Sequence, residues 1–164
     1  MLIVLMTGLF LLAQTSTEPG VIVIDNSDDG RRCYLSARDG STTDFALKTC
    51  SAAIAQPSQS ARRRAISYVN RGVIHYNAGE YQRAFDDFSA AIEKEGFERS
   101  KVYLNRAAAL EALSRGDPTL DAMARLDYNR ALELRPTSEV AKWRLEELSK
   151  PYIDRTPLDP KVIS

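Results

Sequence analysis

The chain has 164 residues, a length typical of a single domain, and its 22 basic residues balance its 22 acidic residues. A charged fraction of 27% and an apolar fraction of 44% argue against a fully disordered, collagen-like or multi-span membrane protein. Net neutrality argues against a dedicated nucleic-acid-binding protein, and a single histidine excludes a histidine-rich metal site. The charges are unevenly distributed along the chain, because residues 30–79 carry eight basic and two acidic side chains.

The first predicted element is an apolar segment from Leu2 to Ala13. It is shorter than the roughly 20 residues of a membrane span and matches the hydrophobic region of a secretory signal peptide. Small residues at Ala13 and Thr15 suit cleavage, so we predict a signal peptide over residues 1–15. The only positive charge before the segment is the amino terminus, which leaves an uncleaved anchor or a misassigned start as alternatives. An exported chain from a Gram-negative bacterium is expected in the periplasm.

The two cysteines, Cys33 and Cys50, are an even number in a chain that is predicted to be exported. An oxidising compartment then favours a disulfide between them. No second cysteine or histidine pair has the spacing of a zinc site, and the remaining alternative is two unrelated buried thiols. We expect residues 16–42, which contain Cys33, to form an extended N-terminal segment.

An internal repeat follows the cysteine segment. Residues 46–54, 84–92 and 124–132 align without gaps: each has an alanine, a larger residue or cysteine four positions on, and alanine then isoleucine or leucine at seven and eight. This spacing places one stripe on a helix. Upstream, the segments Tyr-Val-Asn-Arg-Gly at 68–72 and Tyr-Leu-Asn-Arg-Ala at 103–107 align 35 residues apart.

The pattern resembles the tetratricopeptide repeat (TPR), whose unit has about 34 residues, in an exported form with an N-terminal cysteine pair. The resemblance covers residues 43–149, with about five residues inserted near 114–119. It implies an all-α fold, a short α-solenoid of antiparallel helix pairs with about two full repeats, a degenerate N-terminal unit and a C-terminal capping helix. The signature positions are Gly72, Ala84, Phe88, Ala91, Ala107, Ala124, Tyr128, Ala131 and Pro136.

Helices are predicted over residues 43–56, 60–78, 81–95, 100–115, 118–135 and 139–149. Ser60, Asp117 and Ser138 are expected to cap the N-termini of three of them. Cys50 aligns with Phe88 and Tyr128, so a disulfide there is expected to replace the packing of a missing first helix. Residues 150–164 contain three prolines and are expected to form a weakly ordered tail.

The sequence contains no motif of an enzyme, since a phosphate-binding loop, a nucleophile elbow and a metal-ligand cluster are all missing. No enzyme activity, cofactor or metal is therefore expected. We interpret His75 as an aromatic-like residue at the contact between the helices of one repeat. Arg71 and Arg106 recur in register, as do Asp87 and Asp127, which predicts ion pairs between paired helices. The alternative is that both arginines hold an acidic ligand.

Two surfaces are candidates for binding. The resemblance implies a groove along the inner face of helices 60–78 and 100–115, and Val69 and Val73 there replace the polar residues with which some TPR proteins hold acidic chaperone tails. The groove is therefore mildly apolar and suits an amphipathic helix or an extended peptide. Its predicted lining is Val69, Val73, Tyr76, Leu104, Asn105, Ala108 and Glu111.

The second surface is a basic patch of Arg62, Arg63 and Arg64, which is either a solvated face or a docking site for an acidic partner or an anionic lipid. The leading hypothesis is a non-enzymatic adaptor in the cell envelope that binds a protein or peptide through the groove. The alternative is a structural or assembly factor that docks through the basic patch. A weak homodimer through helix 139–149, with Trp143 as its anchor, is a further expectation.

Overall fold

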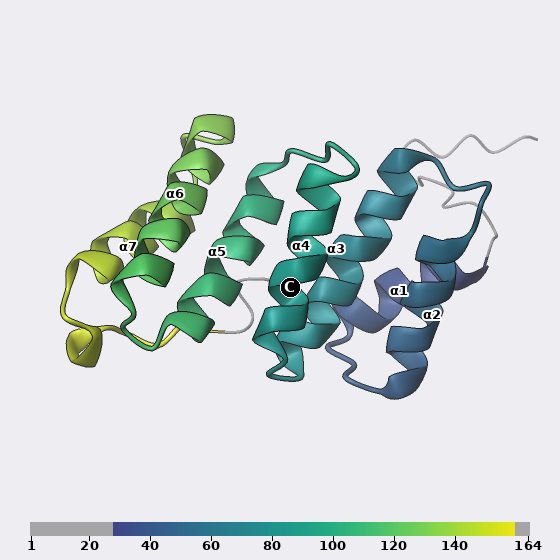
Figure 1. Ribbon diagram of the computed structural model, residues 1–164, viewed down its shortest axis with the longest axis horizontal. Coiled ribbons are helices and arrows are strands. Elements are labelled where there is room, and N and C mark those ends of the chain that lie inside the picture. Colours follow the sequence, from purple (N-terminus) through teal and green to yellow (C-terminus); the bar gives the residue numbers. More distant parts are fainter. Residues whose placement is uncertain (1–27, 160–164) are drawn as a thin grey trace, which may run out of the picture.

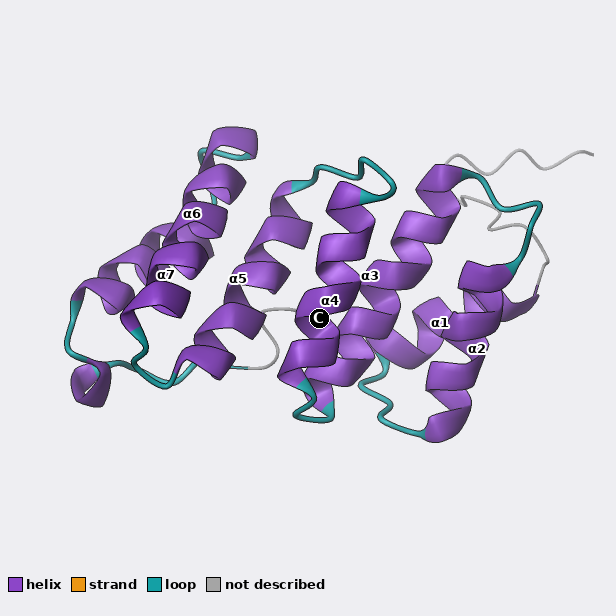
Figure 2. Ribbon diagram, viewed as in Figure 1, coloured by secondary structure: helices purple, strands orange, loops and turns teal. Residues whose placement is uncertain are grey.

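The computed structural model describes residues 28–159, so the predicted signal peptide lies outside the described residues. Within this range all regular secondary structure is helical, which confirms the all-α fold class (Figures 1 and 2). The elements are α1 (Asp28–Arg38), α2 (Asp44–Ala55), α3 (Ala61–Asn77), α4 (Tyr81–Glu93), α5 (Ser100–Ser114), α6 (Pro118–Leu134), α7 (Glu139–Ser149) and the short 3₁₀ helix η1 (Tyr152–Asp154). No described helix is both long and apolar enough to span a membrane.

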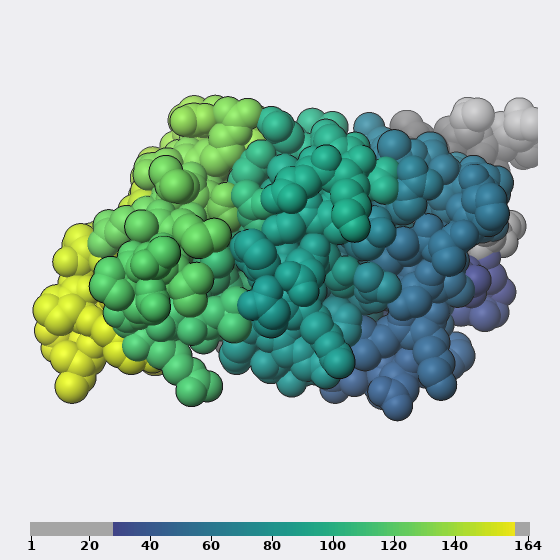
Figure 3. Space-filling view, in the orientation of Figure 1, coloured from purple at the N-terminus to yellow at the C-terminus, as the bar shows by residue number. Residues whose placement is uncertain are grey.

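The helices form three antiparallel pairs, α1–α2, α3–α4 and α5–α6, and α7 packs on α6. Each pair also contacts the next pair through α2–α3 and α4–α5. In the space-filling view, the colours succeed one another in bands from one end of the molecule to the other, so the pairs stack in chain order (Figure 3). This arrangement is a short α-solenoid, in which each unit is covered by its neighbours.

Local sequence determines where most helices begin. The side chains of Thr43, Ser60, Asp117 and Ser138 accept hydrogen bonds from backbone N–H groups in the first turns of α2, α3, α6 and α7. Three of these caps were expected from the sequence, because serine and aspartate satisfy the unpaired N–H groups at a helix start. The inserted residues lengthen α6 to 17 residues, against 13 in α4.

In the α3–α4 pair, an aromatic ring packs on a small residue of the paired helix. Phe88 of α4 is fully buried, and a Cβ added at Gly72 of α3 would lie 2.6 Å from its ring. Ala107 and Tyr128 take the same positions in the next pair and are 0% and 1% exposed. The signature alanines are also fully buried, namely Ala84, Ala91, Ala124 and Ala131.

The predicted ion pairs between paired helices are present. Arg71 donates to both carboxylate oxygens of Asp87 at 2.8 and 2.6 Å, and Arg106 does the same to Asp127 at 2.8 Å each. Each arginine also donates to a serine hydroxyl on the second helix of the preceding pair. Both guanidinium groups are therefore occupied within the fold, where such pairs fix orientation more than they add stability.

The N-terminal unit differs from its prediction. Residues 28–38 form helix α1 rather than part of an extended segment, and Cys33 of α1 is disulfide-bonded to Cys50 of α2 with a Cα–Cα distance of 4.7 Å. The sequence signal was weak because α1 buries only Cys33 and Ala37. Acidic residues in its first turn and Arg38 in its last turn suit the helix dipole. The N-terminal unit is thus a complete but short helix pair.

The described part of the C-terminal tail also differs from its prediction. Residues 150–159, called the C-terminal segment below, turn back from α7 toward α5 and α3 instead of extending away (Figure 1). Leu158 packs against the hydrophobic core. The physical reason is a set of buried charged groups on α6 and α7 that bind this segment, as described next.

A pocket between α3, α5 and the C-terminal segment

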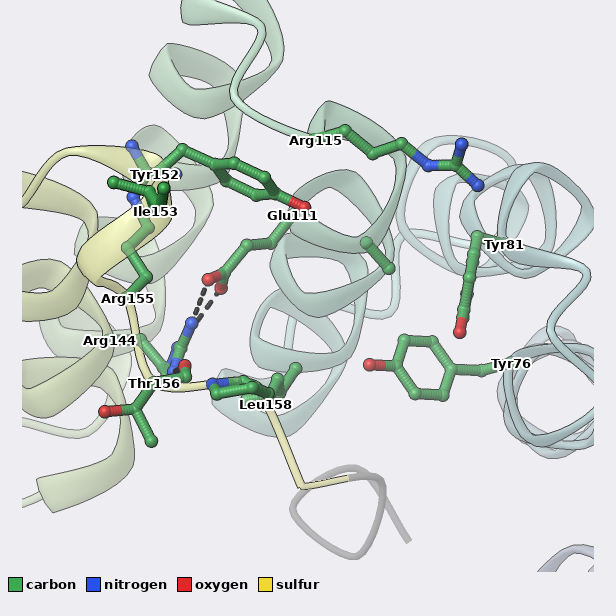
Figure 4. A pocket seen from close by; sticks show the side chains of 12 residues that line it. Tyr76, Tyr81, Glu111, Arg115, Arg144, Tyr152, Ile153, Arg155, Thr156 and Leu158 are labelled. Atoms are coloured by element: carbon green, nitrogen blue, oxygen red, sulfur yellow. Dashed lines mark hydrogen bonds and ion pairs between the residues drawn. The ribbon is translucent and has the colours of Figure 1, made fainter.

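A pocket of about 510 Å³ lies where the ends of α3 and α5 meet the C-terminal segment (Figure 4). Its walls come from parts of the chain that are far apart in the sequence. The lining residues are Tyr76, Tyr81, Glu111, Ala112, Arg115, Arg144, Tyr152, Ile153, Arg155, Thr156, Pro157 and Leu158.

Two tyrosines form the wall on the side of α3 and α4. Tyr76 and Tyr81 pack edge to face, with ring centroids 5.1 Å apart and planes at 63°. The Tyr76 hydroxyl points toward the opposite wall of the pocket, and the Tyr81 hydroxyl points toward Tyr76 (Figure 4). Burial, together with the nearby Tyr81 and Glu111, raises the pKa of Tyr76 well above its ordinary value, so this hydroxyl stays a hydrogen-bond donor.

Glu111 of α5 is the central polar group of the opposite wall. Arg144 of α7 is 1% exposed and binds both oxygens of the Glu111 carboxylate, with Nε at 3.2 Å. The Tyr128 hydroxyl donates to the same carboxylate at 3.0 Å. Arg144 Nη1 also donates to the carbonyl oxygen of Thr156 at 2.9 Å. This network joins α5, α6, α7 and the C-terminal segment, and it neutralises Glu111.

Further contacts hold the C-terminal segment in place as the third wall. The Thr156 N–H donates to Glu147 at 2.6 Å, and Arg155 pairs with Asp121 at 2.6 Å. Hydrogen bonds from Lys150 and from the Thr156 backbone lower the pKa of Glu147 to about 2. Gly116 allows Tyr152 to approach, because a Cβ added at Gly116 would lie 3.1 Å from the Tyr152 side chain.

Arg115 lies at the mouth of the pocket. It caps the C-terminus of α5 with φ 45° and is the one non-glycine residue with a positive φ among residues 28–159. Its exposed side chain extends over the opening toward Tyr81 (Figure 4). The Gly116 N–H donates to the Ser114 hydroxyl at 3.0 Å, and that hydroxyl donates to Asp121 at 2.6 Å, so the turn that carries Arg115 is fixed.

Fewer of the predicted groove residues line a pocket in the structure than the sequence suggested. Tyr76 and Glu111 line the pocket, whereas Val73, Asn105 and Ala108 are buried and are not among the residues that line it. The remaining predicted residues, Val69 and Leu104, are half-buried and pack against the core. Of the predicted groove, only the end at Tyr76 and Glu111 belongs to the pocket.

The predicted basic patch is also smaller than expected. Arg64 binds Glu95 through two hydrogen bonds of 2.6 and 3.0 Å, and the Glu95 side chain is only 7% exposed. Arg62 and Arg63 are exposed at the start of α3. One of the three arginines therefore serves to join α3 to the residues that follow α4.

His75 makes polar contacts that the sequence interpretation did not include. Its Nδ1 lies 2.5 Å from Glu80 and its Nε2 lies 3.9 Å from Asp87. The hydrogen bond with His75 lowers the pKa of Glu80. His75 is not among the residues that line the pocket. Residues 28–159 contain no group of three histidine, cysteine, aspartate or glutamate side chains that could hold a metal ion.

Comparison of the chain with protein-family models, with curated proteins and with solved structures finds no match. The site must therefore be interpreted from its own geometry. Sequence reasoning missed Tyr81, Arg115 and residues 152–158, because the repeat pattern says nothing about where the C-terminal segment runs. The prolines in that segment indicated an extended chain, and this was the only signal that it could lie along another surface.

Proposed function

We propose that this chain is a non-enzymatic protein-binding module of the TPR type, which takes a peptide segment of a partner protein into the pocket. The pocket carries the proposal, because its volume of about 510 Å³ lies in the range of specific ligand sites. Tyr76 and Tyr81 present ring surface beside polar hydroxyl groups, a combination that is common at binding surfaces.

The repeated contacts support the TPR part of the proposal. The Arg71–Asp87 pair recurs 35 to 40 residues on as Arg106–Asp127, and the buried positions of Gly72 and Phe88 recur as the buried Ala107 and Tyr128. Export to the periplasm of a Gram-negative bacterium is part of the same proposal, supported by the apolar segment 2–13 and the disulfide. The proposed function involves no cofactor, metal or nucleic acid. A weak homodimer through α7, with Trp143 as its anchor, stays a prediction.

Crosslinking in intact cells tests the proposal. Tyr81 is replaced by p-azidophenylalanine, which has nearly the same shape, and Phe45 of α2, which is 65% exposed and lies outside the pocket, is replaced in the control chain. After irradiation, we expect mass spectrometry to find one protein attached at position 81 and not at position 45. Adducts from position 63 without any from position 81 would favour the alternative, an assembly factor that docks through the basic patch. No adduct from either position would overturn the proposal.

A further inference from the structure

The charges that line the pocket do not cancel. Glu111 is neutralised by Arg144, and Arg155 is neutralised by Asp121. Arg115 makes no ion pair or side-chain hydrogen bond within residues 28–159. The pocket therefore presents one positive charge that the described part of the fold does not compensate, and it presents no unpaired carboxylate.

The position of Arg115 directs this charge to the opening. The left-handed conformation at Arg115 is unfavourable for a residue with a Cβ, yet the Ser114 hydroxyl bonds hold the turn in place. The side chain extends from the end of α5 toward Tyr81, whose hydroxyl lies at the far end of its ring from the guanidinium (Figure 4). The guanidinium thus lies at the rim of the pocket, beside the wall that Tyr76 and Tyr81 form.

We propose that the pocket recognises an acidic side chain of the partner peptide, with the aspartate or glutamate carboxylate bound to the Arg115 guanidinium. A guanidinium binds a carboxylate through two parallel hydrogen bonds, which gives both charge and direction. The Tyr76 and Tyr81 rings together with Leu158 offer apolar surface for the neighbouring residues of the peptide. This inference rests on the proposed function and specifies its ligand: an acidic residue flanked by apolar ones.

The opposite ligand charge is disfavoured by the same arrangement. A lysine or arginine side chain in the pocket would meet Arg115 and would find Glu111 already bound by Arg144 and by the Tyr128 hydroxyl. Displacing Arg144 would leave a guanidinium that is 1% exposed without its counter-ion, which is strongly unfavourable. The site therefore discriminates by charge as well as by shape.

The test is a selection from a random peptide library displayed on phage against the full disulfide-bonded chain, its R115Q variant and the control R135Q. Arg135 is a suitable control, since it too follows the end of a helix, is exposed and lies outside the pocket. We expect peptides selected on the wild-type chain and on R135Q to share an acidic residue at one position. A selected peptide should bind R115Q at least tenfold more weakly, the loss typical of one charge-assisted hydrogen bond.

A second substitution, made in the peptide, shows whether weaker binding comes from the lost contact between Arg115 and the carboxylate. Replacing the acidic residue of the peptide by its amide should weaken binding to the wild-type chain by a similar factor and should have little further effect on R115Q. The backbone amide signals of Tyr81 and Ala112 report whether a peptide occupies the pocket.

Peptides that shift these signals without any acidic preference would overturn the carboxylate inference and leave the proposed function standing. Selected peptides that leave both signals unchanged, or a selection that enriches none, would overturn the proposed function itself.

Discussion

Gly72 is the position where one added methyl group tests the packing most directly. Substitution of glycine by alanine within a helix ordinarily stabilises it by about 1 kcal/mol, and Gly72 lies in the middle of α3. The structure predicts the opposite sign for Gly72→Ala. The new Cβ would lie 2.6 Å from Cε1, 2.9 Å from Cδ1 and 3.0 Å from Cζ of Phe88.

The magnitude follows from the room available to the ring. Carbon atoms in contact normally lie about 3.5–4.0 Å apart, so the ring or the helix must move by roughly 1 Å. Phe88 is fully buried in a core packed as densely as a crystal, and such overpacking costs about 1–3 kcal/mol, sometimes more. Because three ring atoms are affected, we expect the upper part of that range to outweigh the gain in helix propensity. The net loss of unfolding free energy is then about 1–2 kcal/mol.

Urea unfolding followed by circular dichroism at 222 nm, with the disulfide intact, measures this loss. The double variant G72A/F88L provides the control, since the smaller leucine makes room for the methyl group. We expect the double variant to lose less stability than the sum of the two single variants, by about 1 kcal/mol or more. A rise in stability for Gly72→Ala alone would refute the reasoning, because it would show that Phe88 does not pack against Gly72.

Three further predictions concern the ends of the array. Glu111→Ala removes the counter-ion of the buried Arg144 and should lower the unfolding free energy by about 3–5 kcal/mol in urea titrations, whereas a loss under 1 kcal/mol would contradict the network. Replacing Cys33 and Cys50 together by serine should lower the unfolding free energy by about 3 kcal/mol, the loop-closure term for a loop of this length. The reduced wild-type chain should lose a similar amount, and an unchanged urea midpoint would contradict the prediction. Because the pKa of Glu147 is lowered from 4.5 to about 2, its contribution is complete above pH 4.5 and is lost as the pH falls toward 2. The Thr156 amide signal should follow this acidic range, and a midpoint near 4.5 would show that the two groups are not bonded.

The stacked helices could be predicted from the sequence because the same pattern of small and aromatic residues occurs in both full repeats. Alanine at 84, 91, 124 and 131 with an aromatic residue between determines which face is buried, and caps such as Ser60 determine where helices begin. Helix α1 was missed because it buries only two residues, too few for a periodic signal. It is bonded to α2 through the disulfide and packs against α2 and α3, and these are tertiary contacts that a local pattern does not reveal.

The pocket could be predicted only in part. Tyr76 and Glu111 follow from their places on the first helix of each repeat. The remaining wall depends on long-range contacts, such as Arg144 with Thr156 and Arg155 with Asp121, between residues 12 and 34 positions apart. No spacing rule in the sequence connects them. The same contacts hold the C-terminal segment beside Tyr76 and Glu111, at the end of the predicted groove.

The two ends of the solenoid are closed by different chemistry, and this determines how the molecule comes apart. Stacked units have a neighbour on one side only at each end, so such arrays fray from their ends inward. At the α1–α2 end a covalent bond joins the two helices of the terminal pair, and that bond is broken only by a reductant. The α7 end is held by ionised carboxylates, and we expect acid to loosen it. We therefore expect faster amide hydrogen exchange in α7 than in α2, and a bound peptide would slow exchange mainly at the non-covalent end, where the pocket lies.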